Sequence, residues 1–255
     1  MSVPASRRER LRHELTAAIK DTALDQLARN GPQAVTLRGI ARALEISPAA
    51  IYGYFESLED LYTHLIADGF NVLAQQVEDA IGLYRRSGHE DQMLAALLAY
   101  RLWALEHPEL FRLLYFSPIP GYVAPADGPT FDAALRVSAA FLFVLAEAWS
   151  TGASEQLSPG PQVDTAKFAE RFGLHITPDQ LRTAVGCWGQ FHGLVCLEVA
   201  GHIGVEWTQP GELYESSMRA MVRRAGLPDA SADLTTETVA AALAAHRGAP
   251  RGLHT

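Results

Sequence analysis

The chain contains the stretch Val35-Thr-Leu-Arg-Gly-Ile-Ala-Arg-Ala-Leu-Glu-Ile-Ser-Pro-Ala-Ala-Ile-Tyr-Gly-Tyr-Phe55. It has the pattern of two short helices, near residues 37–44 and 48–55, joined by a tight turn. Thr36 suits the N-cap of the first helix, because its hydroxyl can accept a hydrogen bond from an amide of the first turn. Ser47 suits the N-cap of the second, and Pro48 follows where a missing N–H costs nothing. The first helix has an apolar face formed by Leu37, Ile40, Ala41 and Leu44.

The residues of the turn and of the second helix complete the motif. Glu45 and Ile46 form the turn, and Ile51 and Phe55 are expected to bury the second helix against the first. The small side chain of Ala50 allows the two helices to pack closely. Two short helices, a three-residue turn and a buried apolar residue inside the turn are typical of a helix-turn-helix unit.

Helical periodicity continues through the rest of the chain, and no strand pattern or internal repeat is evident. Further helices are predicted over residues 7–29, 57–84, 91–106, 108–116, 130–150, 177–201 and 211–225. Loops are predicted by composition at 117–129 and 152–164. For the tail from residue 226, a short helix near 235–246 and partial disorder both remain open.

The predicted fold class is therefore all-α, with two domains. An N-terminal three-helix domain with the helix-turn-helix covers residues 1–55, and the helix 57–84 connects it to the rest. A larger helical-bundle domain covers residues 56–225. The tail, residues 226–255, is expected to be partly disordered.

The charges are distributed unevenly along the chain. The net charge is −8, yet residues 1–55 hold eight Lys/Arg against five Asp/Glu, a net +3. The remainder holds thirteen against twenty-four, a net −11. A basic N-terminal segment on an acidic body is compatible with a nucleic-acid footprint. Ordinary variation of surface charge explains the same numbers.

Several classes of protein are not favoured by the sequence. The N-terminus lacks the apolar run of a signal peptide, and no stretch is long and apolar enough to span a membrane. Two cysteines, Cys187 and Cys196, suit a reducing compartment, so a cytoplasmic location is expected. No catalytic motif, cofactor motif or metal-ligand set is found, which leaves an enzyme as a remote alternative.

Over residues 7–65 the sequence resembles the TetR family of transcriptional repressors. The matching positions are Thr36-Leu37, Ile40-Ala41, Ile46-Ser47, Ile51-Tyr52, Tyr54-Phe55, Ser57, Glu59 and Leu61. The resemblance implies a homodimer that binds a partly palindromic operator in double-stranded DNA and releases it when a small-molecule effector binds. A small-molecule-binding protein whose DNA-binding head no longer functions is the alternative.

The resemblance also implies which residues meet DNA. Residues 47–55 would lie in the major groove, and Thr36, Tyr52 and Tyr54 would contact phosphates. The DNA-binding residues expected are Arg7, Arg8, Thr36, Leu37, Arg38, Ser47, Pro48, Ala49, Ala50, Tyr52, Gly53 and Tyr54, with Arg10 and Arg12 nearby. Arg38 is the best candidate for a guanine contact, although a phosphate contact or a solvated position is equally compatible.

Three positions depart from the family pattern. Glu45 stands where the turn usually has Gly, and in a left-handed conformation it would cost about 1–2 kcal/mol. Gly39 replaces an acidic residue, so half of a capping box is missing. Leu58 replaces a Lys, which removes a cation that could face phosphate. These departures put the affinity for DNA in doubt.

In the larger domain, Trp188, His192 and Gly193 resemble a Trp-x-x-x-His-Gly signature of one subgroup of the family. Trp188 and His192 would lie one turn apart on one helix face. The residues expected to bind an effector are Trp103, Phe141, Trp149, Trp188 and His192. Each of them could instead belong to the hydrophobic core, His192 as a hydrogen-bonded core histidine.

The predicted helix 177–201 has no charged residue between Thr183 and Leu197. A helix that is apolar on nearly all sides must be covered on both faces. A smooth stripe along it, where another helix could approach closely, is formed by Gly186, Gly189, Gly193 and Ala200. The sequence therefore predicts a dimer interface here, built with the helix 211–225, unless the covering helix belongs to the same chain.

Overall fold

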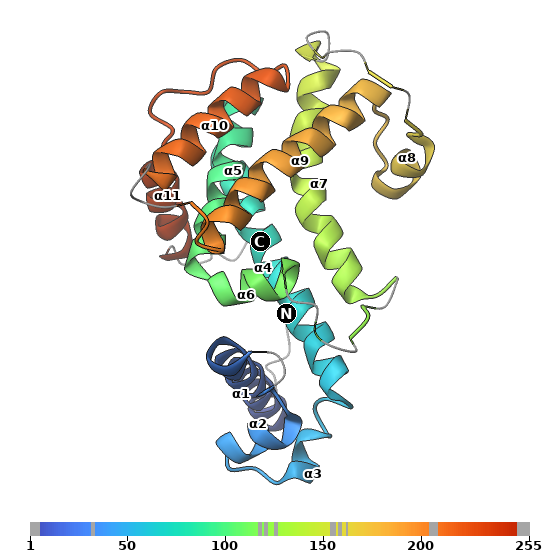
Figure 1. The fold of residues 1–255 in the computed structure, drawn as a ribbon, viewed down its shortest axis with the longest axis vertical. Helices are drawn as coiled ribbons and strands as arrows, with labels where there is room; N and C mark the ends of the chain where they lie inside the picture. The colour runs from blue at the N-terminus through green and yellow to red at the C-terminus, as the bar shows by residue number, and fades with distance from the viewer. Residues whose placement is uncertain are drawn as a thin grey trace. The chain divides into compact units, whose positions relative to one another are not determined.

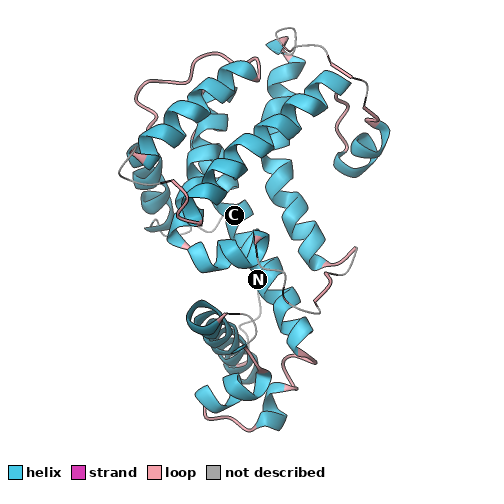
Figure 2. Ribbon diagram, viewed as in Figure 1, coloured by secondary structure: helices cyan, strands magenta, loops and turns pink. Residues whose placement is uncertain are grey.

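The computed structural model describes residues 6–31, 34–116, 119, 122–124, 127–153, 157, 160–161, 163–203 and 209–248. Every regular element in these ranges is a helix, which confirms the predicted all-α class (Figure 2). The chain divides into two compact units. The first consists of Met1–Phe70 and His107–Ala134, and the second of Asn71–Glu106 and Leu135–Thr255.

The first unit contains the helix-turn-helix. Its helices are α1 (Arg7–Asn30), α2 (Leu37–Ala43), α3 (Pro48–Ile51), α6 (Pro108–Tyr115) and the N-terminal part of α4 (Leu58–Leu83). α1 begins in a capping box, in which Ser6 and Glu9 each accept a hydrogen bond from the other's backbone N–H. The core of this unit includes Ile19, Ala23, Leu27, Ile40, Ile51 and Phe55.

Within this unit, α4 is fixed to two other helices. Lys20 on α1 forms an ion pair with Asp68 on α4, at 2.5 Å between Nζ and Oδ2. Gly69, the next residue of α4, lies against Leu110 and Leu114 of α6, where an added Cβ would come within 3.0 Å of both side chains. A side chain at position 69 would therefore require Leu110 and Leu114 to shift.

The second unit is built around α5 (His89–Glu106), which packs against α9 (Pro178–Val199), α10 (Pro210–Arg224) and α11 (Thr236–Gly248) (Figure 1). α7 (Pro129–Ser150) and the short α8 (Ala166–Phe172) complete the described helices of the chain.

Because α5 is buried on nearly all sides, its polar residues need partners. Arg101 of α5 donates hydrogen bonds of 2.8 and 2.6 Å to the carboxylate of Glu198 on α9. Its guanidinium also lies over the ring of Tyr214 on α10, 5.6 Å from the centroid. A single side chain thus connects three helices.

The boundaries of most helices agree with the predicted ranges, with two differences. α3 ends at Ile51, not at residue 55, and turns follow. α8 lies where the sequence predicted no element. In the tail, α11 is a formed helix with Val239 and Leu243 buried, which matches the short-helix alternative for 235–246. Residues 249–255 lie outside the described ranges.

The first unit also extends beyond the predicted domain 1–55, because α6 packs on α1.

Candidate nucleic-acid interface and ligand cavity

The first helix of the motif begins at a side-chain cap formed by Thr36. Thr36 Oγ1 accepts a hydrogen bond from Gly39 N at 3.0 Å. A Cβ on Gly39 would lie 2.9 Å from the same Oγ1, so glycine leaves room for the cap. Because Gly39 has no side chain to accept a hydrogen bond from Thr36 N, only half of a capping box is formed here, as the sequence predicted.

The turn of the motif contains a strained residue. Glu45 has φ 55°, in the left-handed region. Glu45 N donates to Arg42 O at 3.2 Å and Ile46 N donates to Ala41 O at 3.0 Å, which is the Schellman pattern at the end of α2. That pattern requires a left-handed residue and normally selects Gly. The left-handed conformation on which the expected strain depends is therefore present at Glu45.

The second helix begins at Ser47, whose Oγ accepts a hydrogen bond from Ala50 N at 3.1 Å. Pro48 occupies its first position. Exposed side chains around this helix belong to Thr36, Arg38, Ser47, Pro48, Ala49, Ala50 and Tyr52, and Gly53 is exposed as well. These residues form one accessible region of the helix-turn-helix and coincide with predicted DNA contacts.

Two predicted contacts are placed differently. Leu37 is only 7 % exposed, so its side chain belongs to the core and cannot read DNA as expected. Its backbone N–H, at the first position of α2, has no partner inside the helix and remains suited to phosphate. Tyr54 is half-buried. Arg7 and Arg8 are exposed on the first turn of α1.

Arg12 of α1 fixes the end of the recognition segment. Its guanidinium donates a hydrogen bond of 3.2 Å to Gly53 O and lies 5.3 Å from the ring centroid of Tyr54. Sequence reasoning placed Arg12 only in the neighbourhood of the DNA. The structure gives this arginine a positioning role for Gly53 and Tyr54.

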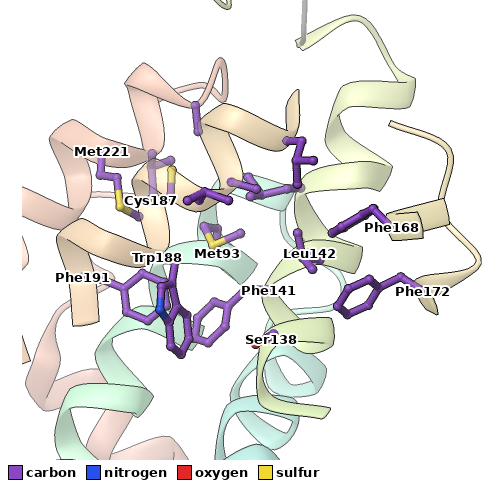
Figure 3. A pocket seen from close by; sticks show the side chains of 16 residues that line it. Met93, Ser138, Phe141, Leu142, Phe168, Phe172, Cys187, Trp188, Phe191 and Met221 are labelled. Carbon is purple, nitrogen blue, oxygen red and sulfur yellow. The ribbon is translucent and has the colours of Figure 1, made fainter. Parts of the chain in front are cut away.

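The second unit contains an apolar cavity of about 280 Å³. Figure 3 shows Phe141, Trp188 and Phe191 grouped at one end of it, and Phe168 and Phe172 of α8 at the other. The ring centroids of Phe141 and Phe191 are 4.7 Å apart, and those of Phe168 and Phe172 are 4.5 Å apart. Aromatic walls of this kind are common in sites for small molecules.

Only two of the five residues predicted to bind an effector line this cavity, namely Phe141 and Trp188. Trp103 is completely buried in the core, and Trp149 donates its indole N–H to Ala225 O at 2.9 Å. These two tryptophans support the fold and do not reach the cavity. The sequence missed the two phenylalanines of α8, although their spacing of four is that of neighbours on a helix.

His192 lies behind Trp188 and outside the cavity lining. Its Nδ1 lies 2.8 Å from the hydroxyl of Tyr100, and its Nε2 lies 3.3 Å from Cys196 Sγ. Burial lowers the pKa of His192, which favours the neutral ring. The core-histidine alternative is therefore the one that the structure favours. Cys196 stands four residues after His192, a spacing that should have identified it as a neighbour.

The glycine stripe of α9 is uncovered in the described part of the chain. No described atom lies within 4 Å of a Cβ added at Gly186, Gly189 or Gly193. The neighbouring Val185 and Leu197 are 61 % and 44 % exposed. Ala200, at the C-cap of α9, is exposed too. The covering helix is thus not found among the described residues of this chain.

None of the described helices combines the length and apolarity needed to cross a membrane. The exposed helix-turn-helix defines a DNA-binding regulator. Two family models match the chain: "Bacterial regulatory proteins, tetR family" over residues 19–65, and "Tetracyclin repressor-like, C-terminal domain" over residues 93–221.

Curated relatives and solved structures agree with these models. HTH-type transcriptional regulator Rv1816 of Mycobacterium tuberculosis is 33 % identical over 224 residues, which is 85 % of this chain and 94 % of the relative. The crystal structure of regulatory protein SCO4313 is 27 % identical, has a TM-score of 0.66 and covers 85 % of this chain and 98 % of that one. A tetR-family protein of Rhodococcus RHA1 has the same fold, with a TM-score of 0.60, 17 % identity and coverage of 84 % and 98 %.

The chain belongs to the TetR family of transcriptional regulators. The resemblance read from the helix-turn-helix residues is confirmed, and so is a regulatory rather than enzymatic function, because the family and the relatives are regulators. The narrower subgroup signature around Trp188 and His192 stays a prediction.

Proposed function

We propose that this regulator is a ligand-released repressor that acts as a homodimer on a partly palindromic operator. The observation that carries the proposal is the cavity of about 280 Å³ in the unit without the helix-turn-helix. A regulator that only bound DNA would have no need of such a space. Because its partner is DNA, the protein is expected to act in the cytoplasm.

The DNA-binding part of the proposal uses the accessible region of the helix-turn-helix. Arg38 is exposed on α2 and can reach a base edge or a phosphate. Ala49 and Ala50 have no hydrogen-bonding side chain, so they can contact only apolar groups such as a thymine methyl. Arg38 and Tyr52 carry the long polar side chains of this region, and only Arg38 is a cation, so much of the selectivity is expected to come from DNA shape.

The dimer part of the proposal uses α9 and α10. Uncovered glycines in a helix cost stability relative to Ala, and the exposed Val185 and Leu197 add apolar surface beside them. A second copy of the chain that presents the same face would cover the glycines and these two apolar side chains. It would also give the two-fold symmetry that a palindromic operator requires.

Release follows if the effector binds one conformation of the dimer more tightly than the other. The effector would then change the separation of the two recognition helices. This separation must match one helical repeat of DNA for both helices to enter the major groove.

The alternative, a ligand-binding protein with a non-functional head, has one observation in its favour, the strained Glu45. A salt titration of binding to genomic DNA fragments tests the two against each other. A repressor selects particular fragments and keeps this preference as salt rises, although its affinity falls. Loss of all binding at moderate salt, with no fragment preferred, would contradict the proposal.

A further inference from the structure

We propose that the cavity takes an uncharged, mainly apolar molecule of about eleven non-hydrogen atoms that carries one hydrogen-bonding group. The inference rests on the proposed ligand-released function and adds the chemical class of the ligand. An apolar cavity of about 150 Å³ in another protein holds benzene, so about 280 Å³ accommodates roughly twice as many atoms.

The lining determines the polarity of the ligand. No Asp, Glu, Lys, Arg or His lines the cavity, and most of its wall is aliphatic or aromatic. An ionised group placed there would lose its hydration without gaining a partner, which disfavours acids and amines. Met93 and Met221, at the positions labelled in Figure 3, are flexible and can adapt to the shape of the guest.

The raised pKa of the Cys187 thiol agrees with an apolar, uncharged lining. Its thiol faces the cavity, and burial raises its pKa to about 11. The cavity wall therefore disfavours negative charge even on its own side chain. Arg224, the cation that acts on Cys187, is engaged with Gln190 Oε1 at 2.5 Å. Arg224 itself is not among the residues that line the cavity.

One side chain can anchor a polar group of the ligand. Ser138 of α7 lines the cavity, and its hydroxyl has no hydrogen-bond partner in the described part of the chain. A serine hydroxyl both donates and accepts, so it suits an alcohol or a carbonyl. The ligand is expected to place its polar atom at Ser138 and its apolar body between the aromatic groups at the two ends.

The test uses three probes that share a ten-carbon chain and differ in charge: 1-decanol, decanoate and decylammonium. Each is titrated calorimetrically into the full-length protein at pH 7, below the concentration at which it aggregates. One decanol per chain is expected to bind, with both ions at least about tenfold weaker. Tighter binding of either ion, or binding of none of the three, would overturn the inference.

Two serine variants test whether decanol binds in the cavity. Ser138→Ala is expected to weaken decanol binding by roughly threefold to tenfold, as loss of one hydrogen bond does. Ser150→Ala is the matched control, because this serine lies exposed on the same helix and bonds only to Glu147 O at 2.7 Å. Equal decanol affinity in wild type and Ser138→Ala would remove Ser138 from the site and contradict the proposed anchor.

Leu142→Lys adds a gain of function. Leu142 is half-buried in the lining, so a lysine there can hold its ammonium at the edge of the cavity. This variant is expected to prefer decanoate to decanol, and circular dichroism checks that it folds. A folded variant with the wild-type order of affinities contradicts the inference.

If decanol binds as expected yet leaves the affinity for DNA unchanged, the proposed class of ligand stands and the proposed release of DNA by a ligand fails.

Discussion

Trp188 and His192 lie one turn apart on α9 with their rings stacked, the centroids 5.0 Å apart and the planes inclined by 13°. Only Trp188 reaches the cavity, while His192 supports it from behind and is bonded to Tyr100. This arrangement separates a residue that would touch the ligand from a residue that would position it.

The half-buried His192 is expected to make stability depend on pH. Burial lowers its pKa in the folded chain below the unfolded value of about 6.5, so the unfolded state binds the proton more readily. Its contribution is fully present above pH 6.5 and is lost as pH falls from there through the lowered folded pKa. Urea unfolding between pH 7.5 and 5 measures this loss. His192→Gln, which keeps a hydrogen-bonding side chain but does not titrate, should show a smaller loss, and equal losses would contradict the assignment.

Relief of the strain at Glu45 is expected to stabilise the protein. Glu45→Gly should raise the free energy of unfolding by about 1 kcal/mol, because glycine adopts φ 55° without the steric cost of a Cβ. Glu45→Ala is the control, since it removes the charge and keeps the Cβ. Thermal unfolding distinguishes them: equal melting temperatures of the two variants would show that the charge, not the backbone, matters.

The role of Arg38 is tested by selection of binding sites from random DNA. Arg38→Ala should lower affinity by about 1–3 kcal/mol and relax the preference at one base position if Arg38 reads guanine. Tyr54→Phe is the comparison, because loss of a phosphate contact weakens binding to all sequences by a similar factor. An unchanged selected sequence for Arg38→Ala assigns this arginine to phosphate instead.

The glycine face of α9 gives a test of dimerisation. Gly193→Leu should weaken the dimer without disturbing the monomer, because no described atom lies within 4 Å of the added Cβ. Gly82→Leu is the matched control, a glycine of α4 that is exposed and equally open. Sedimentation equilibrium at micromolar concentration measures the effect. A wild-type monomer, or equal association of both variants, would exclude this face as the interface.

The helix-turn-helix could be predicted because its signals are local. Thr36 and Ser47 cap helices within three residues of themselves, and the Glu45 conformation follows from the end of the preceding helix. The surroundings of His192 could not be predicted in the same way, since Tyr100 is 92 positions distant in the chain. Only the packing of α5 on α9 brings the two together.

The residues that line the cavity also could be predicted only in part from the sequence. Aromatic residues of the larger domain were recognised, but nothing local distinguishes Phe141, which lines the cavity, from the fully buried Trp103. α8 was missed because it is only seven residues long and its N-cap residue, Thr165, makes no side-chain capping bond, whereas the equally short α2 was identified by its cap Thr36. A role for Phe168 and Phe172 of α8 becomes evident only in the folded structure, where both residues line the cavity.

The central claim, release of DNA by a ligand in the cavity, is tested most directly by the affinity for a selected operator with and without such a ligand. The ligand must be one whose binding is weakened by Ser138→Ala and not by Ser150→Ala. At saturation it should lower operator affinity at least about fivefold, the smaller end of typical coupling between sites. The same operator affinity with the cavity filled and empty would contradict the account.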